Sequence, residues 1–359
     1  MNKFLVEKLN IDSNKPYIIG ETAYNHEGDI VYLKQMITEI AELKLNAVKF
    51  HLLLKLESYM QKKHSLLTVL KQWVFSEVQW REIFAFSESK KLDVVALCDD
   101  VESMEFINKE FPDLFAIELH ASCLNDLFLL KEAAKFKGLI VVGVGGSTLD
   151  EIEYAVRYLT AYTNKILLMY GFQSYPTDYK DINLNKMLKL CELYNLPVGY
   201  ADHMGFDDNN NEQVSAMGAF MGVNVLEKHY TCDFGKKRID YHSAVGKKQM
   251  RKIKKLMELG LTVRGSGNIE MSEPELKYGN TGPMKKAIVA KRDLKAGTKL
   301  TEQDLWFKRT EEETPVKQYQ FKQFLGLELV NDVGEDEIID FSKVEYKFQK
   351  LDQKSFTNT

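Results

Sequence analysis

Gly199-Tyr200-Ala201-Asp202-His203 and Val225-Leu226-Glu227-Lys228-His229-Tyr230 are two short apolar runs, and each leads into a histidine with a carboxylate beside it. A helix-length stretch separates them, so together they are typical of a strand–helix–strand unit. Neutral imidazole is a common ligand of transition metals, and two on adjacent strand ends leave positions open for water and substrate. We predict a divalent-metal site with His203 and His229 as ligands. The alternative for either histidine alone is a hydrogen-bonded residue at a strand end.

The same alternation of strand and helix extends over the first 265 residues. Apolar runs alternate with stretches in which apolar residues return every three or four positions, as in a helix packed on a sheet. Runs that are apolar throughout need cover on both faces, which favours parallel pairing. We therefore predict a (β/α)8 barrel, with a doubly wound open sheet as the alternative. The strands are expected at residues 17–23, 47–52, 93–99, 114–120, 139–145, 165–172, 197–202 and 224–230, and helices at 30–45, 77–91, 124–135, 148–160 and 183–194.

Composition sets limits on the partners. The 359 residues include 48 basic and 52 acidic side chains, so the formal net charge of −4 indicates neither nucleic acid nor a membrane surface. We find no signal-peptide pattern and no apolar run of about 18 residues, so the cytoplasm is the expected location. The four cysteines are widely spaced, which argues against a disulfide framework and against a thiolate zinc site.

A change in composition and apolar periodicity after residue 265 predicts a second domain. Residues 266–284 are rich in glycine and poor in periodic apolar positions, as expected of a linker or lid. Residues 285–346 form a compact pattern again, and the polar tail 347–359 is expected to fray. A core of about 60 residues is small, so this module is expected to rest on the barrel or on a second subunit.

In a barrel of this kind, side chains at the carboxyl ends of the strands line one mouth. Lys49 lies in the apolar run Ala-Val-Lys-Phe, where a lone ammonium is costly unless an anion compensates it. A ligand phosphate or carboxylate would do so; the alternative is an internal carboxylate such as Glu21. Gly145-Gly146-Ser147 could hold a phosphate on backbone amides, or could simply be a tight turn. The other polar residues near the strand ends are Asn25, His51, His120, Gln173 and Tyr175.

Six motifs then carry a resemblance to a known family. They are residues 18–28 (IIGETAYNHEG), 47–50 (AVKF), 145–152 (GGSTLDEI), 174–177 (SYPT), 198–203 (VGYADH) and 226–231 (LEKHYT). In order and spacing this set resembles the sialic acid synthase family. Residues 290–297 and 304–309 resemble the antifreeze-like (SAF) domain of that family.

The resemblance implies a barrel that condenses phosphoenolpyruvate with an N-acylated hexosamine aldehyde, releasing phosphate and using manganese or magnesium. It implies that His203 and His229 hold the metal, and that Glu21 contacts sugar hydroxyls and manages protons. Lys49 would face phosphoenolpyruvate, with Asp202 and Glu227 as further catalytic candidates. It also implies a domain-swapped homodimer in which Arg309 reaches the sugar of the neighbouring subunit. The expected substrate-binding residues are Asn25, His51, His120, Gln173, Tyr175, Asp240 and Arg309.

The sequence also departs from the family pattern at the phosphate side. No lysine occurs between Lys109 and Lys131, where the family has a second phosphate-binding lysine. At positions where the family has a hydroxyl side chain or asparagine, this sequence has Cys98, Val142-Gly143, Gln173 and Ala201. Three hypotheses remain: a divergent phosphoenolpyruvate-dependent synthase, which we favour; a same-barrel aldolase or lyase acting on a sugar acid; and a noncatalytic sugar-binding homologue.

Overall fold

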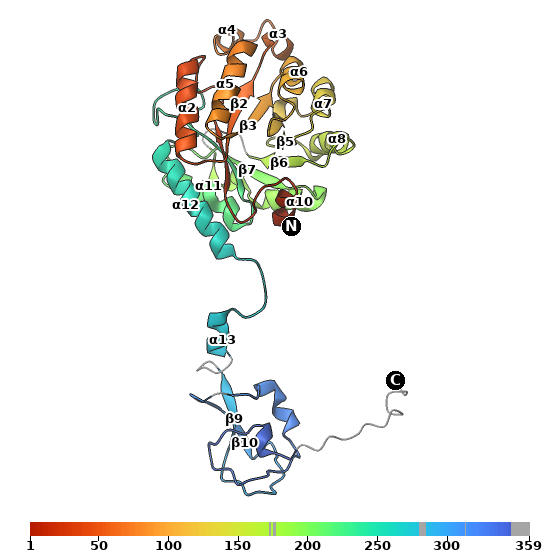
Figure 1. Cartoon of the computed structure of the whole chain (residues 1–359), viewed down its shortest axis with the longest axis vertical. Helices are drawn as coiled ribbons and strands as arrows, with labels where there is room; N and C mark the ends of the chain where they lie inside the picture. The colour runs from red at the N-terminus through yellow and green to blue at the C-terminus, as the bar shows by residue number, and fades with distance from the viewer. Residues whose placement is uncertain (172–173, 175–176, 280–284, 313, 346–359) are drawn as a thin grey trace. The chain divides into compact units, whose positions relative to one another are not determined.

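The computed structural model describes residues 1–171, 174, 177–279, 285–312 and 314–345. The chain divides into two compact units, Met1–Ser266 and Gly267–Thr359 (Figure 1). We describe each unit by itself.

The first unit is a closed barrel of eight parallel strands in chain order, which confirms the predicted (β/α)8 fold. The strands are β1 (Tyr17–Glu21), β2 (Ala47–Leu52), β3 (Asp93–Cys98), β4 (Ala116–Leu119), β5 (Leu139–Gly143), β6 (Ile166–Tyr170), β7 (Val198–Asp202) and β8 (Val225–His229). Helices surround them in Figure 1: α2 (Ile30–Glu42), α5 (Glu77–Ser89), α6 (Val101–Glu110), α7 (Leu127–Ala133), α8 (Leu149–Thr160), α10 (Asn185–Tyr194), α11 (Asn211–Phe220) and α12 (Lys247–Arg264). The short helices α1 (Asn2–Glu7), α3 (Leu56–Tyr59), α4 (Leu67–Leu70) and α9 (Tyr179–Ile182) complete the unit.

Helix α7 begins later than the sequence predicts. The pattern predicted one helix over residues 124–135, but a 3₁₀ turn at Ala121–Cys123 comes first. Asp126 then caps α7, because its carboxylate accepts hydrogen bonds from the backbone N–H groups of Phe128 and Leu129. An aspartate at the N-cap satisfies amides that have no partner in the helix, and it therefore sets where the helix starts.

Two apolar layers hold the barrel. Outward strand residues such as Val48 and Ile117 are fully buried against the helices. Inside, small and branched residues such as Ala47, Val95 and Val141 form a second cluster. Residues of the N-terminal segment, Val6 among them, belong to this inner cluster. The lower part of the barrel interior is thus packed with apolar side chains, and Glu21 and His229 lie at the carboxyl ends of their strands.

Strand register brings the first polar residues together. The barrel closes through parallel pairing of β1 with both β2 and β8, and Glu21 lies opposite Lys49 on one side and His229 on the other. Residues paired in register and alternating inward share one layer of the barrel interior. Three distant parts of the sequence therefore meet at one level of the barrel.

The second unit contains α13 (Glu273–Gly279) and an antiparallel pair, β9 (Lys286–Ala290) with β10 (Leu305–Arg309). It also has two 3₁₀ turns, Gln318–Gln323 and Phe341–Lys343. This unit has an apolar cluster of its own, which includes Ile288, Leu305, Phe324 and Ile339. Among the described residues of both units, no helix has the length and apolar character needed to cross a bilayer.

Candidate active site

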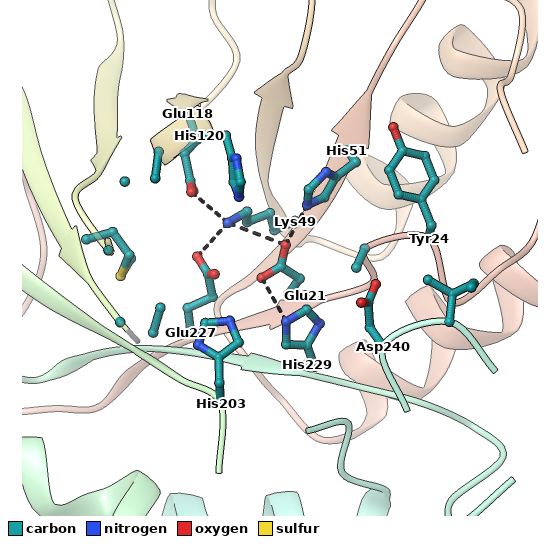
Figure 2. Close-up of a pocket in the computed structure, with 18 residues that line it drawn as sticks. Glu21, Tyr24, Lys49, His51, Glu118, His120, His203, Glu227, His229 and Asp240 are labelled. Atoms are coloured by element: carbon teal, nitrogen blue, oxygen red, sulfur yellow. Dashed lines mark hydrogen bonds and ion pairs between the residues drawn. The ribbon is translucent and has the colours of Figure 1, made fainter. Parts of the chain in front are cut away.

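A cavity of about 310 Å³ lies at the carboxyl ends of the barrel strands (Figure 2). Side chains from opposite sides of the barrel point into it, and most of them are ionisable. Its polar lining is Glu21, Tyr24, Lys49, His51, Glu118, His120, His203, Glu227, His229 and Asp240.

Three carboxylates surround the ammonium of Lys49. Its Nζ lies 2.7 Å from Oε1 of Glu118, 2.9 Å from Oε2 of Glu227 and 3.4 Å from Oε1 of Glu21. Dashed lines mark these three contacts in Figure 2. Burial disfavours the charged lysine, but the carboxylates outweigh burial and raise the pKa of Lys49 well above its usual value. The sequence left open whether Lys49 faces a ligand anion or an internal carboxylate. The structure places internal carboxylates around it, and Glu118 is the nearest of them.

A chain of hydrogen-bonding groups leads outward from Glu21. Nε2 of His51 lies 3.1 Å from Oε1 of Glu21, and Nδ1 of His51 lies 3.5 Å from Oδ2 of Asp99. The hydroxyl of Tyr24 donates to the same Asp99 oxygen at 3.2 Å. Burial acts against the charged imidazole, but the bonds to Asp99 and Glu21 prevail and raise the pKa of His51 to about 10. His51 is therefore a cation whose two nitrogens are already committed to carboxylates.

The rings of His203 and His229 lie side by side, with centroids 5.2 Å apart. Burial lowers the pKa of His203 to about 4 and that of His229 to about 3, so both are neutral near pH 7. Neutral imidazole is the form that ligates metals. Nε2 of His229 also lies 3.9 Å from Oε2 of Glu21. Within the described part of the chain, no group of three or more histidine, cysteine or acidic side chains has metal-binding spacing.

The carboxyl groups differ in their readiness to hold a proton. Burial opposes ionisation of Glu21, yet the charge of Lys49 and a hydrogen bond from His51 outweigh burial and hold its pKa well below the usual range. Burial and the neighbouring charge of Glu21 raise the pKa of Glu227 well above it. Burial also raises the pKa of Glu118, and among the described residues its Oε2 atom has no hydrogen-bond partner. The cavity thus contains a firmly ionised carboxylate beside carboxyl groups that take up protons more readily.

Comparison with known proteins places this architecture in a family. The NeuB family matches residues 29–268, and the SAF domain matches residues 285–345. The chain belongs to the NeuB family.

Relatives in this family match most of the chain. It is 28% identical over 352 residues to an uncharacterised protein of Methanocaldococcus jannaschii, covering 94% of this chain and 98% of that protein. It is 27% identical to the N,N'-diacetyllegionaminic acid synthase of Campylobacter jejuni, covering 90% and 99% respectively. The crystal structure of N-acetylneuraminic acid synthetase from Leptospira borgpetersenii, solved with citrate, aligns with a TM-score of 0.68 and 25% identity, over 74% of this chain and 90% of that one.

Within this NeuB family barrel, two residues predicted for the site lie outside the cavity lining. Asp202 faces the helices: its Oδ2 lies 2.5 Å from Nζ of the fully buried Lys228 and accepts from Ser215 at 2.6 Å. Asn25 donates to the backbone oxygen of Ile239 at 2.7 Å, next to Asp240. Asp202 therefore braces the barrel wall, and Asn25 fastens the loop that carries Asp240, so we correct their expected roles accordingly.

Three other residues expected at the site lie outside the described part of the barrel. Gln173 and Tyr175 lie outside the described residues. Arg309 belongs to the second unit, at the exposed end of β10.

Three residues that take part in the site were missed by sequence reasoning: Glu118, Tyr24 and Asp99. Glu118 had a readable signal, because a glutamate inside the apolar run of β4 needs a buried partner, and Lys49 sits in a similar run. Tyr24 follows the first strand and Asp99 the third, each within a motif dominated by other polar residues, so neither stood out.

The glycine pair after β5 behaves as a turn. A Cβ on Gly145 would lie 2.0 Å from the backbone oxygen of Gly171, so only glycine allows this approach of neighbouring strand ends. Gly146 has a φ of +76°, which most residues avoid. Packing and backbone conformation thus explain both glycines, without a phosphate.

Proposed function

We propose that this NeuB family member is a metal-dependent enzyme that joins a three-carbon enolpyruvyl or pyruvyl donor to the aldehyde carbon of an N-acylated hexosamine. The product would be a sialic or nonulosonic acid. One observation carries the proposal: two neutral imidazoles, His203 and His229, stand beside the ionised Glu21 at the mouth of a closed barrel. Relatives named as synthases of such acids support the product class.

The donor set fits a divalent metal such as manganese or magnesium. Two neutral imidazoles supply two ligands, and ions of this kind commonly keep several water molecules that a substrate can replace. We propose His203 and His229 as the ligands. A bound cation would polarise the sugar carbonyl as a Lewis acid.

The residues around the pair suit a polyhydroxylated acceptor. Glu21 is held ionised and can accept hydrogen bonds from sugar hydroxyls. Asp240 approaches from the loop that Asn25 fastens, and it lines the same cavity. Glu227, whose pKa is raised, can deliver a proton to an oxygen that becomes negative during bond formation.

Phosphoenolpyruvate is the donor that the family resemblance implies, and the lysine cluster weighs against it. Two unit charges of like sign about 4 Å apart repel by about 4 kcal/mol at an effective dielectric constant of 20. A phosphate near Lys49 would be attracted by that one ammonium and repelled by the carboxylate of Glu118, and Glu21 and Glu227 on the same ammonium add to the repulsion. An aldol reaction with an unphosphorylated donor is therefore the second candidate.

A product-based assay tests the proposal without presupposing the donor. The protein would be incubated with manganese, N-acyl hexosamines and either phosphoenolpyruvate or pyruvate, and the keto-sugar acid detected by mass spectrometry. We expect product with wild type and at least about a hundredfold less with His203→Ala or His229→Ala. Manganese binding without product from any pair would contradict the proposed reaction. Absence of manganese binding would favour a noncatalytic sugar-binding protein.

A further inference from the structure

We infer that Glu118 makes this cavity specific for an unphosphorylated 2-oxo acid of the pyruvate class, and that its carboxylate is the base that takes a proton from the donor's methyl carbon. The inference rests on the proposed function, because it names the donor of that same reaction. It goes beyond that function in giving Glu118 two linked roles, exclusion of phosphate and activation of the donor.

The charges around Lys49 disfavour a phosphate in this cavity. Lys49 is the one lysine or arginine among the described residues that line the cavity, and three carboxylates already surround it. The other cation, His51, is bound between Glu21 and Asp99. A phosphate beside Lys49 would have to displace Glu118 and then remain next to it. Repulsion between like charges in a buried site opposes that arrangement.

The cavity wall near Glu118 offers few hydrogen-bond donors. Phosphate groups are usually held by several charged or polar donors. Among the described residues of this wall, His120, which follows β4, is the one side chain that can donate a hydrogen bond to a phosphate oxygen. The other described lining residues on β5 to β7 and in the loops that follow β4 to β6 are small or apolar: Ala121, Gly143, Gly145, Met169, Gly171 and Ala201. A compact donor without phosphate fits this wall.

The carboxylate of Glu118 has the properties of a base. Its Oε1 atom is fixed by Lys49 at 2.7 Å, while Oε2 is buried and, in the described part of the chain, has no hydrogen-bond partner. Burial raises the pKa of Glu118, which makes it a better proton acceptor than an exposed carboxylate. Glu118 lines the cavity, so a small rotation of its side chain would turn the uncommitted oxygen toward a bound donor.

The chemistry connects these two roles. An enol phosphate already carries its nucleophilic carbon, so it needs a phosphate clamp and no carbon base. Pyruvate needs a base at its methyl carbon and no phosphate clamp. Its methyl C–H bond breaks, the proton goes to Glu118, and the electron pair forms the enolate. The methyl carbon then bonds to the aldehyde carbon, and the aldehyde oxygen takes up a proton. No phosphate leaves, no water is consumed, and Glu118 releases its proton to solvent.

Proton exchange tests the base without any sugar. Wild-type protein with magnesium and pyruvate in deuterium oxide is expected to replace methyl hydrogens by deuterium, measured by mass spectrometry. Glu118→Gln should slow this exchange by about a hundredfold or more. Glu118→Asp keeps the charge but has a shorter side chain, which moves the carboxylate oxygens away from the donor. Exchange in this variant should therefore also be slow. The matched control is Glu105→Gln on the exposed face of α6, which should exchange like wild type.

Ligand binding to metal-free protein tests the exclusion of phosphate. Titration calorimetry with phosphoenolpyruvate and with inorganic phosphate should give at least about tenfold tighter binding for Glu118→Gln than for wild type, and tighter still for Glu118→Lys. Glu118→Asp should continue to exclude both ligands. Circular dichroism and the melting temperature would identify any variant that fails to fold.

The outcomes separate this inference from the function it rests on. Exchange that depends on Glu118, without product from any hexosamine, would support the inference and contradict the proposed acceptor. Phosphate release from phosphoenolpyruvate with product formation, and no pyruvate exchange, would overturn the inference and leave the proposed function standing. Exchange that Glu118→Gln and Glu118→Asp leave unchanged would overturn the role of Glu118.

Discussion

Glu227 and Asp202 occupy similar places in the sequence, beside a histidine at a strand end, yet they face opposite sides of the barrel wall. Side chains along a strand alternate between faces, so Glu227 shares the inner face with His229, two residues on. Asp202 is one residue before His203 and faces outward, where it meets Lys228. At the residue scale, the parity of a position decides whether a carboxylate serves the cavity or the wall.

The buried pair of Asp202 and Lys228 leads to a stability prediction. Asp202→Ala should lower the free energy of unfolding by about 3 to 5 kcal/mol, because it leaves a fully buried ammonium without its carboxylate. The double variant Asp202→Ala with Lys228→Met should recover part of this loss, since no charge is then left unpaired. Urea unfolding measures both. A double variant less stable than the single one would contradict an ion-pair role.

His26 gives a prediction on pH. Its ring is 1% exposed, stacks on Phe75 and accepts a hydrogen bond from the Gly28 N–H. Burial lowers the pKa of His26 from 6.5 to about 3, so the folded chain holds this ring neutral. Stability from this residue is complete above pH 6.5 and is lost as the pH falls, by about 1.4 kcal/mol per pH unit, because the unfolded chain takes up the proton.

The measurement is a comparison of variants, because other buried histidines titrate as well. Urea unfolding of wild type and His26→Gln between pH 7 and pH 5 should show a shallower loss of stability in the variant. His64→Gln, at an exposed position, is the control and should follow wild type. Equal slopes for His26→Gln and wild type would mean that His26 is protonated in the folded chain.

At the scale of elements, helix α8 begins with a capping box. The Thr148 side chain accepts from the Glu151 N–H, and the Glu151 carboxylate accepts from the Thr148 N–H. Thr148→Ala should cost about 1 kcal/mol of unfolding free energy, whereas Thr148→Ser should stay close to wild type because serine caps equally well. Urea unfolding of the pair is the test, and equal losses in both variants would exclude the cap.

The elements themselves were predictable from the sequence, for a physical reason. Each strand is covered on both faces, so each appears as a mainly apolar run, and the turns between runs are often marked by glycine, asparagine or aspartate. Helix ends were less predictable. Asp126 starts α7 later than its apolar periodicity indicates, since capping depends on one side chain.

The site was predictable only in part, because the register between strands cannot be derived from local sequence patterns. His203, His229, Glu21 and Lys49 could be chosen as strand-end residues, and the structure brings them to one cavity. Glu118 lies on β4 and Lys49 on β2, and β3 lies between these two strands. The contact of Glu118 with Lys49 therefore depends on how the strands are staggered. The sequence showed that a lysine was missing there, and the structure shows which side chain compensates Lys49.

At the scale of the whole molecule, the SAF domain raises the question of how it serves the barrel. The family resemblance predicts a domain-swapped homodimer in which Arg309 acts on the site of the neighbouring subunit. Arg309 ends β10 on an exposed edge, and its side chain forms no ion pair with any described residue. Arg309→Ala is therefore expected to raise the KM for the sugar and to leave manganese affinity unchanged. A fall in manganese affinity would contradict this role for Arg309.

Mixing two impaired variants, assayed at a low sugar concentration, tests the swapped dimer directly. Arg309→Ala and His203→Ala each impair every site in their own homodimers. In a swapped heterodimer, one site combines an intact barrel with an intact Arg309, and the other combines both defects. Subunit exchange between equal amounts should therefore restore about a quarter of the wild-type sites, since half of the dimers are mixed and each has one good site. Product formation after exchange is the readout. If Arg309 served its own barrel, mixing would restore nothing beyond the average of the two variants.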